Sequence, residues 1–192
     1  SKIYGIEVQQ EVAEMAQRSI KLNNLENRFE IINKNIKDLE SVFDKNSFDF
    51  IITNPPYKKM DTGKTNENSK KLISRHEITA TLKDFIKISY IMLKDKGTLY
   101  MVHKPERLVD IIYQLRKNKI EPKEIRFVHP YEKKEPNLIL IKAVKNGGQF
   151  LKIDKPLYVY NERGEYTEEI LKIFNYKKDE KDASKTKNIW RK

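Results

Sequence analysis

The tetrapeptide Asn54-Pro55-Pro56-Tyr57 carries the clearest chemical signal in the sequence. The Asn54 side-chain oxygen and the Pro55 carbonyl oxygen are two hydrogen-bond acceptors, and the two prolines fix the backbone that holds them. Acceptors on both N–H groups of a planar amino group would free its nitrogen lone pair to attack an electrophilic methyl group. The Tyr57 ring offers a surface on which a planar base or amide can stack. We therefore predict that Asn54, Pro55, Pro56 and Tyr57 form a catalytic turn.

This turn must lie at the end of a strand. Residues 48–53, FDFIIT, form an apolar run typical of a buried strand, and two consecutive prolines cannot continue its hydrogen-bond ladder. The chain therefore presents the turn at the carboxyl end of that strand, where open α/β sheets bind their ligands. The structural alternative is a rigid turn that buries a core tyrosine.

The surrounding elements alternate between strands and helices. Such alternation predicts an α/β fold with a mainly parallel sheet that helices cover on both faces. Two late strands joined by a polar stretch predict a C-terminal antiparallel hairpin. The expected strands span residues 3–8, 29–32, 48–53, 98–102, 125–128 and 138–144, and the expected helices cover residues 12–20, 82–93 and 105–115.

The helix over residues 82–93 has start and stop signals in the sequence. Ser74-x-x-Glu77 and Thr81-x-x-Asp84 are both possible capping boxes for it. Gly97 is expected to end it. In the following helix, Pro105 suits a first-turn position.

Composition limits the classes of protein that remain possible. With 192 residues and a formal net charge of +11, the chain suits one domain and either a polyanionic partner or a lysine-rich solvated surface. The absence of cysteine excludes disulfides and thiolate metal sites, and the three histidines have no ligand-like spacing, so we expect no metal. No apolar run approaches the roughly 20 residues of a membrane span, and no signal peptide opens the chain. We expect a monomeric cytoplasmic protein.

Two further strand ends carry polar side chains that could bind a ligand. Glu7 ends the first expected strand, where an acid can bind the two hydroxyl groups of a ribose. It could instead interact with the dipole of the helix that follows. Asn35 follows the second strand and could hydrogen-bond an adenine amino group or simply stabilise a turn.

The tetrapeptide and several longer stretches carry a resemblance to a known family. Asn-Pro-Pro-Tyr resembles the signature of class I methyltransferases that transfer a methyl group from S-adenosylmethionine to an amino group. The stretches YGIEVQQEVAEMAQRSIKLNNL, SRHEITATLKDF, MVHKPERL and GEYTEEI resemble the bacterial adenine-N6 methyltransferases that act on the anticodon loop of a valine tRNA. The likeness covers most of residues 3–175 and implies a Rossmann-like class I fold.

The resemblance also implies roles for individual residues. Glu7 with Val8 would hold the ribose of S-adenosylmethionine, and Asn35 with Ile36 would lie beside its adenine, although aspartate is usual in the family at position 35. Asn54 would contact both the cofactor and the target adenine. Backbone contacts to tRNA would come from basic residues near the turn, namely Lys58, Lys59, Lys70, Lys71, Arg75 and Lys104.

The sequence departs from the family pattern at its beginning. The family has a glycine-rich first motif after a central strand, and the 6 glycines of this chain form no such cluster. We expect that strand and loop to precede Ser1, so that residues 1–175 form an N-terminally incomplete methyltransferase domain. Residues 176–192 are predominantly basic and are expected to form a disordered tail.

Other functions remain open from the sequence. The same tetrapeptide occurs in glutamine-N5 methyltransferases that modify proteins. A DNA adenine methyltransferase is disfavoured, since 192 residues leave no room for a separate target-recognition domain. From another class, the chain could be a non-catalytic RNA-binding protein that has lost its first motif.

Overall fold

The computed structural model describes residues 2–57 and 80–174. The predicted tail and the Ser74-x-x-Glu77 box therefore lie outside the described residues. In chain order, with η for a 3-10 helix, the elements are β1 (Ile3–Glu7), α1 (Gln10–Leu22), β2 (Phe29–Asn33), η1 (Ile36–Ser41), β3 (Phe48–Thr53), α3 (Leu82–Met92), β4 (Leu93–His103), η3 (Pro105–Arg107), α4 (Leu108–Lys117), β5 (Ile120–His129), β6 (Leu138–Lys145), β7 (Lys152–Ile153), β8 (Leu157–Tyr158) and α5 (Glu168–Ile173).

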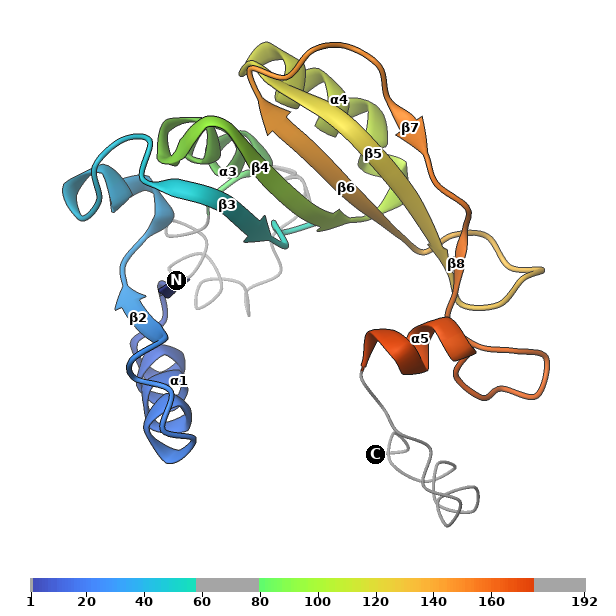
Figure 1. The fold of residues 1–192 in the computed structure, drawn as a ribbon, viewed down its shortest axis with the longest axis horizontal. Coiled ribbons are helices and arrows are strands. Elements are labelled where there is room, and N and C mark those ends of the chain that lie inside the picture. The colour runs from blue at the N-terminus through green and yellow to red at the C-terminus, as the bar shows by residue number, and fades with distance from the viewer. Residues whose placement is uncertain (1, 58–79, 175–192) are drawn as a thin grey trace, which may run out of the picture.

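The strands form two separate sheets (Figure 1). β1 and β2 pair in parallel, with Glu7 opposite Asn33 at their carboxyl ends. The second sheet has the order β3-β4-β6-β5-β7, with β8 also paired to β5. β3 and β4 are parallel, whereas β6 runs antiparallel to both β4 and β5. The predicted mainly parallel pairing and the C-terminal antiparallel hairpin are therefore confirmed.

One face of the larger sheet carries the main hydrophobic core. The register places Ile51, Leu99 and Ala143 side by side on this face. α3 and α4 cover it, and Ile86, Ile111 and Leu115 are fully buried within the core (Figure 1). The helices expected over residues 82–93 and 105–115 thus form and pack on this face.

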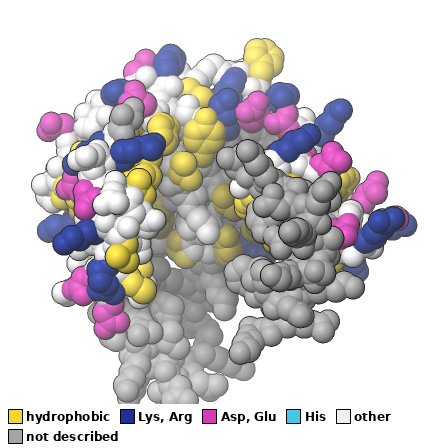
Figure 2. Space-filling model, turned by 60° about the horizontal axis from the view of Figure 1, so that its bottom comes forward, with side chains coloured by type: hydrophobic (Ala, Val, Ile, Leu, Met, Phe, Trp, Pro, Cys, Tyr) yellow, Lys and Arg dark blue, Asp and Glu magenta, His cyan; other side chains and the backbone are white. Residues whose placement is uncertain are grey.

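The opposite face of the same sheet corrects the prediction of two covered faces. Ile52 and Tyr100 are paired neighbours on that face, and they are 71% and 42% exposed. No helix in the described part of the chain covers them. Hydrophobic side chains are visible in a hollow on the side of the molecule shown in Figure 2, surrounded by charged residues. Sequence periodicity predicted the strands, but β3 has an exposed face, because an apolar pattern cannot show which element covers each face.

Three aromatic rings connect the two sheets. Tyr4 of β1 contacts Phe43 and Phe48 edge-on, with ring centroids 5.0 Å and 5.9 Å apart. Phe43 and Phe48 make the same type of contact at 5.0 Å. Edge-to-face geometry is favoured by the charge distribution of aromatic rings. This cluster fixes the start of β3 against β1, although the two strands share no ladder.

The junction of α3 and β4 confirms one predicted signal and corrects another. Thr81 caps α3 in a complete capping box with Asp84. The helix ends at Met92 and β4 begins at Leu93, so Gly97 does not end the helix. Gly97 instead lies where the β3–β4 register shifts, and a Cβ there would be 2.9 Å from the Lys94 carbonyl oxygen. Close backbone approach therefore explains this glycine.

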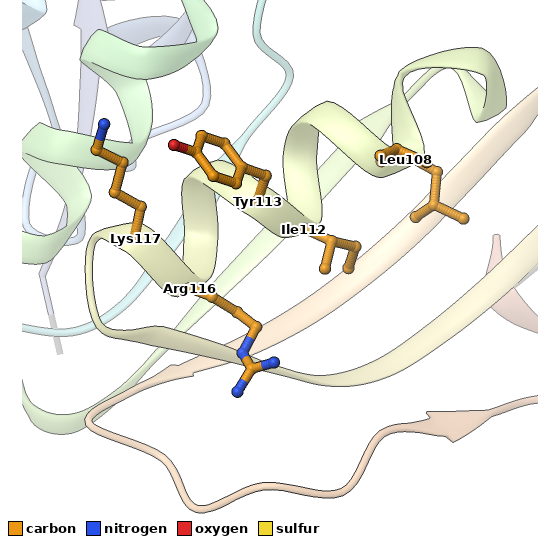
Figure 3. A pocket seen from close by; sticks show the side chains of 6 residues that line it. Leu108, Ile112, Tyr113, Arg116 and Lys117 are labelled. Atoms are coloured by element: carbon orange, nitrogen blue, oxygen red, sulfur yellow. The ribbon is translucent and has the colours of Figure 1, made fainter.

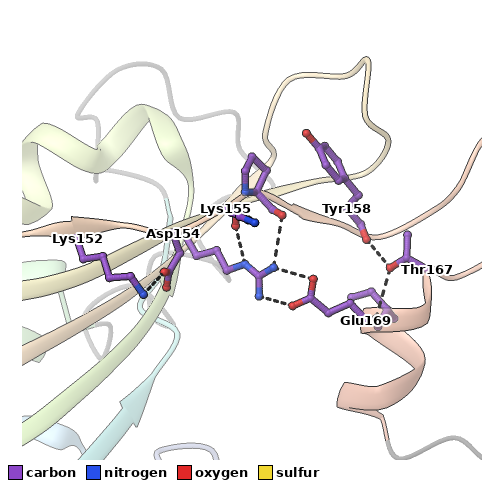
Figure 4. A network of polar contacts seen from close by, with 9 residues as sticks. Lys152, Asp154, Lys155, Tyr158, Thr167 and Glu169 are labelled. Carbon is purple, nitrogen blue, oxygen red and sulfur yellow. Dashed lines mark hydrogen bonds and ion pairs between the residues drawn. The ribbon is translucent and has the colours of Figure 1, made fainter.

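Besides the pairing of β7 and β8 with β5, a network of polar contacts joins β5 to the C-terminal elements (Figure 4). Both terminal nitrogens of Arg126 donate to the Glu169 carboxylate of α5, at 2.7 Å and 2.8 Å. Arg126 Nε also donates to the Lys155 carbonyl at 2.9 Å. Val128, Leu157 and Ile170 are buried together beside this network. Polar and apolar contacts thus hold α5 at the carboxyl end of β5.

We expect Arg126→Lys to loosen α5 selectively. Lysine keeps the charge but cannot donate in two parallel directions to Glu169 while also bonding to Lys155. Hydrogen exchange should become several-fold faster for the amides of α5 and stay unchanged for those of α4. Lys123→Met is a suitable control, since Lys123 lies on the same strand and bonds only to carbonyls of residues 148–150. If the α5 amides exchanged at the same rate in the Arg126→Lys variant as in the unmutated protein, this role would be contradicted.

Candidate active site

The predicted catalytic turn lies directly at the carboxyl end of β3. Pro55 is fully buried, whereas Asn54 and Pro56 are exposed and Tyr57 is half-buried. The Asn54 side chain makes no hydrogen bond to any residue that the structure describes. Buried Pro55 therefore anchors the turn, and the Asn54 amide oxygen remains available to a ligand.

Residues at the end of the neighbouring strand β4 hold Tyr57. Because Thr53 pairs with Met101, the turn lies beside the chain that leaves β4. Arg107 Nη1 donates to the Tyr57 carbonyl oxygen at 3.1 Å. The His103 ring contacts the Tyr57 ring edge-on at 5.1 Å, and Lys104 Nζ lies 5.7 Å from the centre of that ring. The Tyr57 backbone and ring are both fixed by this segment.

The protonation of His103 follows from its contacts. His103 is 0% exposed, and its Nδ1 accepts the backbone N–H of Lys104 at 2.8 Å. A ring nitrogen that accepts a hydrogen bond carries no proton, so the proton of the neutral ring lies on Nε2. Burial, and after it the charge of Arg107, lowers the pKa of His103. His103 is therefore neutral near pH 7.

A second polar group lies at the carboxyl ends of β1 and β2. Glu7 Oε1 accepts the backbone N–H of Gln9 at 2.8 Å, which orients the carboxylate. Asn33 Nδ2 donates to the Glu7 carbonyl at 2.8 Å and links the two strand ends. Val8 follows Glu7 and is exposed. One carboxylate oxygen of Glu7 is thus fixed by the backbone, and the other can accept from a hydroxyl group.

Asn35 and Ile36 follow β2 at the same edge. Asn35 is the N-cap of η1, and its side-chain oxygen accepts the backbone N–H of Lys37 at 3.0 Å. Asn35 therefore stabilises a turn, which is one of the two roles that the sequence left open. A contact of Asn35 with an adenine remains a prediction.

The structure brings the predicted residues together in two groups. Glu7 and Asn35 lie at adjacent strand ends of the smaller sheet, and Lys104 lies beside Tyr57 in the larger one. The other predicted RNA contacts lie outside the described residues, namely Lys58, Lys59, Lys70, Lys71 and Arg75. Sequence reasoning missed the contacts of His103 and Arg107 with Tyr57. The stretch MVHKPERL held the signal, because it contains the end of the strand that pairs with β3 and the residues that come next.

Two surface pockets are lined by residues outside the predicted turn. One is lined only by residues of α4 (Figure 3), where Val109 is 82% exposed and Lys117 Nζ lies 5.6 Å from the Tyr113 ring centre. Another lies on the bare face of the larger sheet and includes Ile52 and Tyr100. Within the described ranges, no group of three or more His, Asp or Glu residues could hold a metal ion. The described helices are also too short or too polar to cross a membrane.

Comparison with known proteins identifies the family. Residues 1–136 match the family model described as Eco57I restriction-modification methylase. The chain belongs to this family. The match includes both polar groups at the strand ends and the segment that holds Tyr57.

Curated relatives of this methylase-family chain act on tRNA according to their names. Two strains of Porphyromonas gingivalis have a tRNA1(Val) (adenine(37)-N6)-methyltransferase, 27% and 26% identical to this chain over 142 residues. The match covers 73% of this chain and 55% of each relative, so the chain spans about half the length of these relatives. The resemblance seen in the sequence is thereby confirmed.

Solved structures show the fold. A predicted O-methyltransferase from Agrobacterium tumefaciens has a TM-score of 0.72 and 20% identity, over 91% of this chain and 77% of that one. Geranyl diphosphate C-methyltransferase from Streptomyces coelicolor, solved with S-adenosyl-L-homocysteine, has a TM-score of 0.54 and 13% identity, over 76% and 63%. The chain has the class I methyltransferase fold, as predicted.

S-adenosylmethionine is the cofactor of this fold family, and the described residues fit part of it. The oriented Glu7 carboxylate suits a ribose diol, and polar groups of the β2 end lie next to it. Gly147 and Gly148 are adjacent, but they follow β6 rather than a strand of the smaller sheet, so the described groups near Glu7 suit the nucleoside portion of the cofactor rather than its methionine portion.

Proposed function

We propose that this protein transfers a methyl group from S-adenosylmethionine to the N6 amino group of an adenine in tRNA, in an anticodon loop. The observation that carries the proposal is the exposed Asn54 amide on a turn anchored by buried Pro55 at the end of β3. The names of the Porphyromonas gingivalis relatives support adenine in tRNA as the target.

The residues of the turn act on the amino group of the target. An adenine amino nitrogen is a poor nucleophile, because its lone pair is delocalised into the ring. Acceptance of its two N–H groups by Asn54 Oδ1 and the Pro55 carbonyl favours a pyramidal nitrogen with an available lone pair. Bound S-adenosylmethionine would supply an electrophilic methyl group, with S-adenosylhomocysteine, a neutral thioether, as the leaving product, and the methylated nitrogen would then lose its extra proton to water. The leaving group therefore needs no general acid, and positioning contributes much of the catalysis.

RNA binding must offset the cost of exposing the base. Unstacking a base from a folded loop costs about a few kcal/mol. The Tyr57 ring can stack on the exposed base, and Lys104 beside it can contact a backbone phosphate. The net charge of +11 favours such a polyanionic partner.

The proposal is tested by measuring transfer of label from a labelled methyl donor to each of three substrates, in separate reactions with the protein. These are unmodified total tRNA, unmethylated DNA and a peptide release factor, and digestion to nucleosides or amino acids follows. We expect label in N6-methyladenosine from tRNA. Label only in N6-methyladenine from DNA would favour the second candidate, a DNA adenine methyltransferase, which the family description supports. Label only in glutamine would exclude a nucleic-acid substrate, and no label would favour a non-catalytic RNA-binding protein.

We expect Glu7→Gln to weaken binding of the cofactor by about tenfold, since the amide loses the charge that strengthens bonds to the ribose hydroxyls. Isothermal titration with S-adenosylhomocysteine measures this change directly. Glu11→Gln is the matched control, because Glu11 is an acid in the first turn of α1. Equal weakening by both variants would mean that Glu7 acts only through the helix dipole.

A further inference from the structure

His103 contains a buried hydrogen-bond donor that the structure leaves unused. Its Nδ1 is occupied by the Lys104 N–H, while Nε2 is buried and has no hydrogen-bond partner in the described part of the chain. Buried polar groups are almost always paired, because an unpaired one loses its bonds to water without replacement. An unpaired N–H beside a catalytic turn therefore points to a partner that is reached in another state of the protein.

The backbone carbonyls of the turn are the candidate acceptors for this donor. The Pro56 backbone is close enough to the His103 ring to raise its pKa, while Nε2 makes no hydrogen bond in the described part of the chain. The next carbonyl along the chain, that of Tyr57, already accepts from Arg107 Nη1 at 3.1 Å. Catalytic hydrogen bonds are often long in the free enzyme and tighten when substrate binds. A small movement of the turn would thus complete a pair of donors on consecutive carbonyls.

The two donors come from a rigid support. His103 is the last residue of β4, and its ring contacts the Tyr57 ring at 5.1 Å. Arg107 Nε donates to Asp110 Oδ2 at 2.8 Å, which ties the guanidinium to α4. Arg107 is also mostly buried, at 16% side-chain exposure. Both groups are therefore placed by the core of the larger sheet, whereas Asn54 and Pro56 are exposed.

We propose that His103 and Arg107 are positioning residues for the catalytic turn: His103 Nε2–H donates to the Pro56 carbonyl when substrate is bound, while Arg107 holds the Tyr57 carbonyl. With both carbonyls held, the Pro55 carbonyl and the Asn54 amide keep a fixed separation and direction. The inference deepens the proposed function, because it concerns the same amino-binding turn. It applies equally to an adenine or a glutamine amide.

Nitrogen-15 NMR of the histidine rings tests the donor directly and needs no activity. The chain has three histidines, so selective labelling gives few signals, and His103→Gln assigns one of them. We expect a neutral ring with the proton on Nε2. On addition of S-adenosylhomocysteine and a short adenine-containing RNA stem-loop, its N–H proton should shift downfield as the bond forms. A proton on Nδ1, or no shift while other signals report binding, would overturn the proposal.

Kinetics of three variants test the positioning role. The amide nitrogen of glutamine can take the place of Nε2, whereas the asparagine side chain reaches only to the place of Nδ1, and phenylalanine keeps the ring alone. We expect His103→Phe and His103→Asn to lower kcat by about ten- to a hundredfold, because misplacement of the reacting groups by even 1 Å slows the reaction. KM and cofactor affinity should stay within about twofold, and His103→Gln should regain much of kcat. Equal loss in all three, or a loss confined to KM, would contradict positioning.

The NMR and kinetic results also separate this inference from the proposed function. If the labelled product is methylglutamine or methylated DNA, tRNA is wrong as the substrate, and the NMR titration is repeated with the substrate that was labelled. A response of His103 to that substrate would still support the positioning role. If tRNA is methylated but His103 does not respond, the proposed function stands and the positioning role is wrong.

Discussion

Asn54→Ala is expected to lower kcat for methyl transfer by about a hundredfold to a thousandfold, the cost typical of removing one preorganised polar group that acts in the transition state. The amide oxygen of Asn54 is one of two acceptors for the target amino group in the proposed mechanism. Its loss leaves one N–H without an acceptor and the nitrogen lone pair delocalised. Single-turnover transfer from labelled S-adenosylmethionine to unmodified tRNA measures the effect.

The environment of Asn54 allows an effect on catalysis to be separated from an effect on folding. Its side chain is exposed and makes no hydrogen bond among the described residues, so alanine removes no contact that holds the fold. The midpoint of thermal unfolding should therefore stay within about 1 °C of the unmutated value, because surface substitutions usually change stability by less than about 0.5 kcal/mol. Cofactor affinity should also change by less than about twofold.

Asn54→Asp is the matched variant. Aspartate has the same size and keeps an acceptor oxygen, so it should retain more activity than alanine. If Asn54→Ala weakened cofactor binding as strongly as it slowed transfer, Asn54 would bind the cofactor rather than act on the amino group. If both variants transferred methyl groups normally, the catalytic role of the turn would be wrong.

The local elements of this protein were largely predictable from the sequence. β3 spans Phe48–Thr53 as expected, since an apolar run followed by two prolines has a defined end. Thr81 and Asp84 gave the start of α3 because a capping box involves only residues three apart. The predicted end of α3 at Gly97 was wrong. In the sequence, a glycine that allows close backbone approach in a bulge cannot be distinguished from one that ends a helix.

Long-range pairing was not predictable, and the candidate site depends on it. The contact of Arg107 with the Tyr57 carbonyl joins residues 50 positions apart and requires β3 and β4 to be parallel neighbours. The sequence identified the Asn54–Tyr57 turn by its residue types but gave no means to find what supports it. α5 was missed because its 6 residues are too few to show helical periodicity.

Lys145→Met should destabilise the protein by about 1–3 kcal/mol, the cost of leaving buried hydrogen-bond acceptors without a donor. Lys145 ends β6 and is 5% exposed. Its Nζ donates to Asn46 Oδ1, the Tyr90 carbonyl and the Leu93 carbonyl at 2.6, 2.7 and 2.8 Å. The ammonium also lies 4.4 Å from the Tyr90 ring centre. Methionine keeps the length of the side chain but leaves all three acceptors without their donor.

The position of this network predicts which property is lost. β6 runs antiparallel to β4, so Lys145 lies at the amino end of β4, opposite the strand ends that carry Asn54 and His103. Lys145 joins the turn before β3, the end of α3 and the start of β4, and it therefore supports the sheet rather than the turn. The folded Lys145→Met variant should have an unchanged kcat, whereas its midpoint of urea unfolding should fall sharply.

Lys142→Met is the matched control, since Lys142 lies on the same strand and faces the uncovered side of the sheet. It pairs with Glu124 at 3.3 Å, and both side chains are more than a third exposed, at 39% and 35%. Exposed ion pairs contribute little, so this variant should change stability by less than about 1 kcal/mol. A loss for Lys145→Met no larger than that for Lys142→Met would show that the buried ammonium is not what holds β6 to α3. A fall in kcat at full folding would mean that the amino end of the sheet controls the turn at the opposite end.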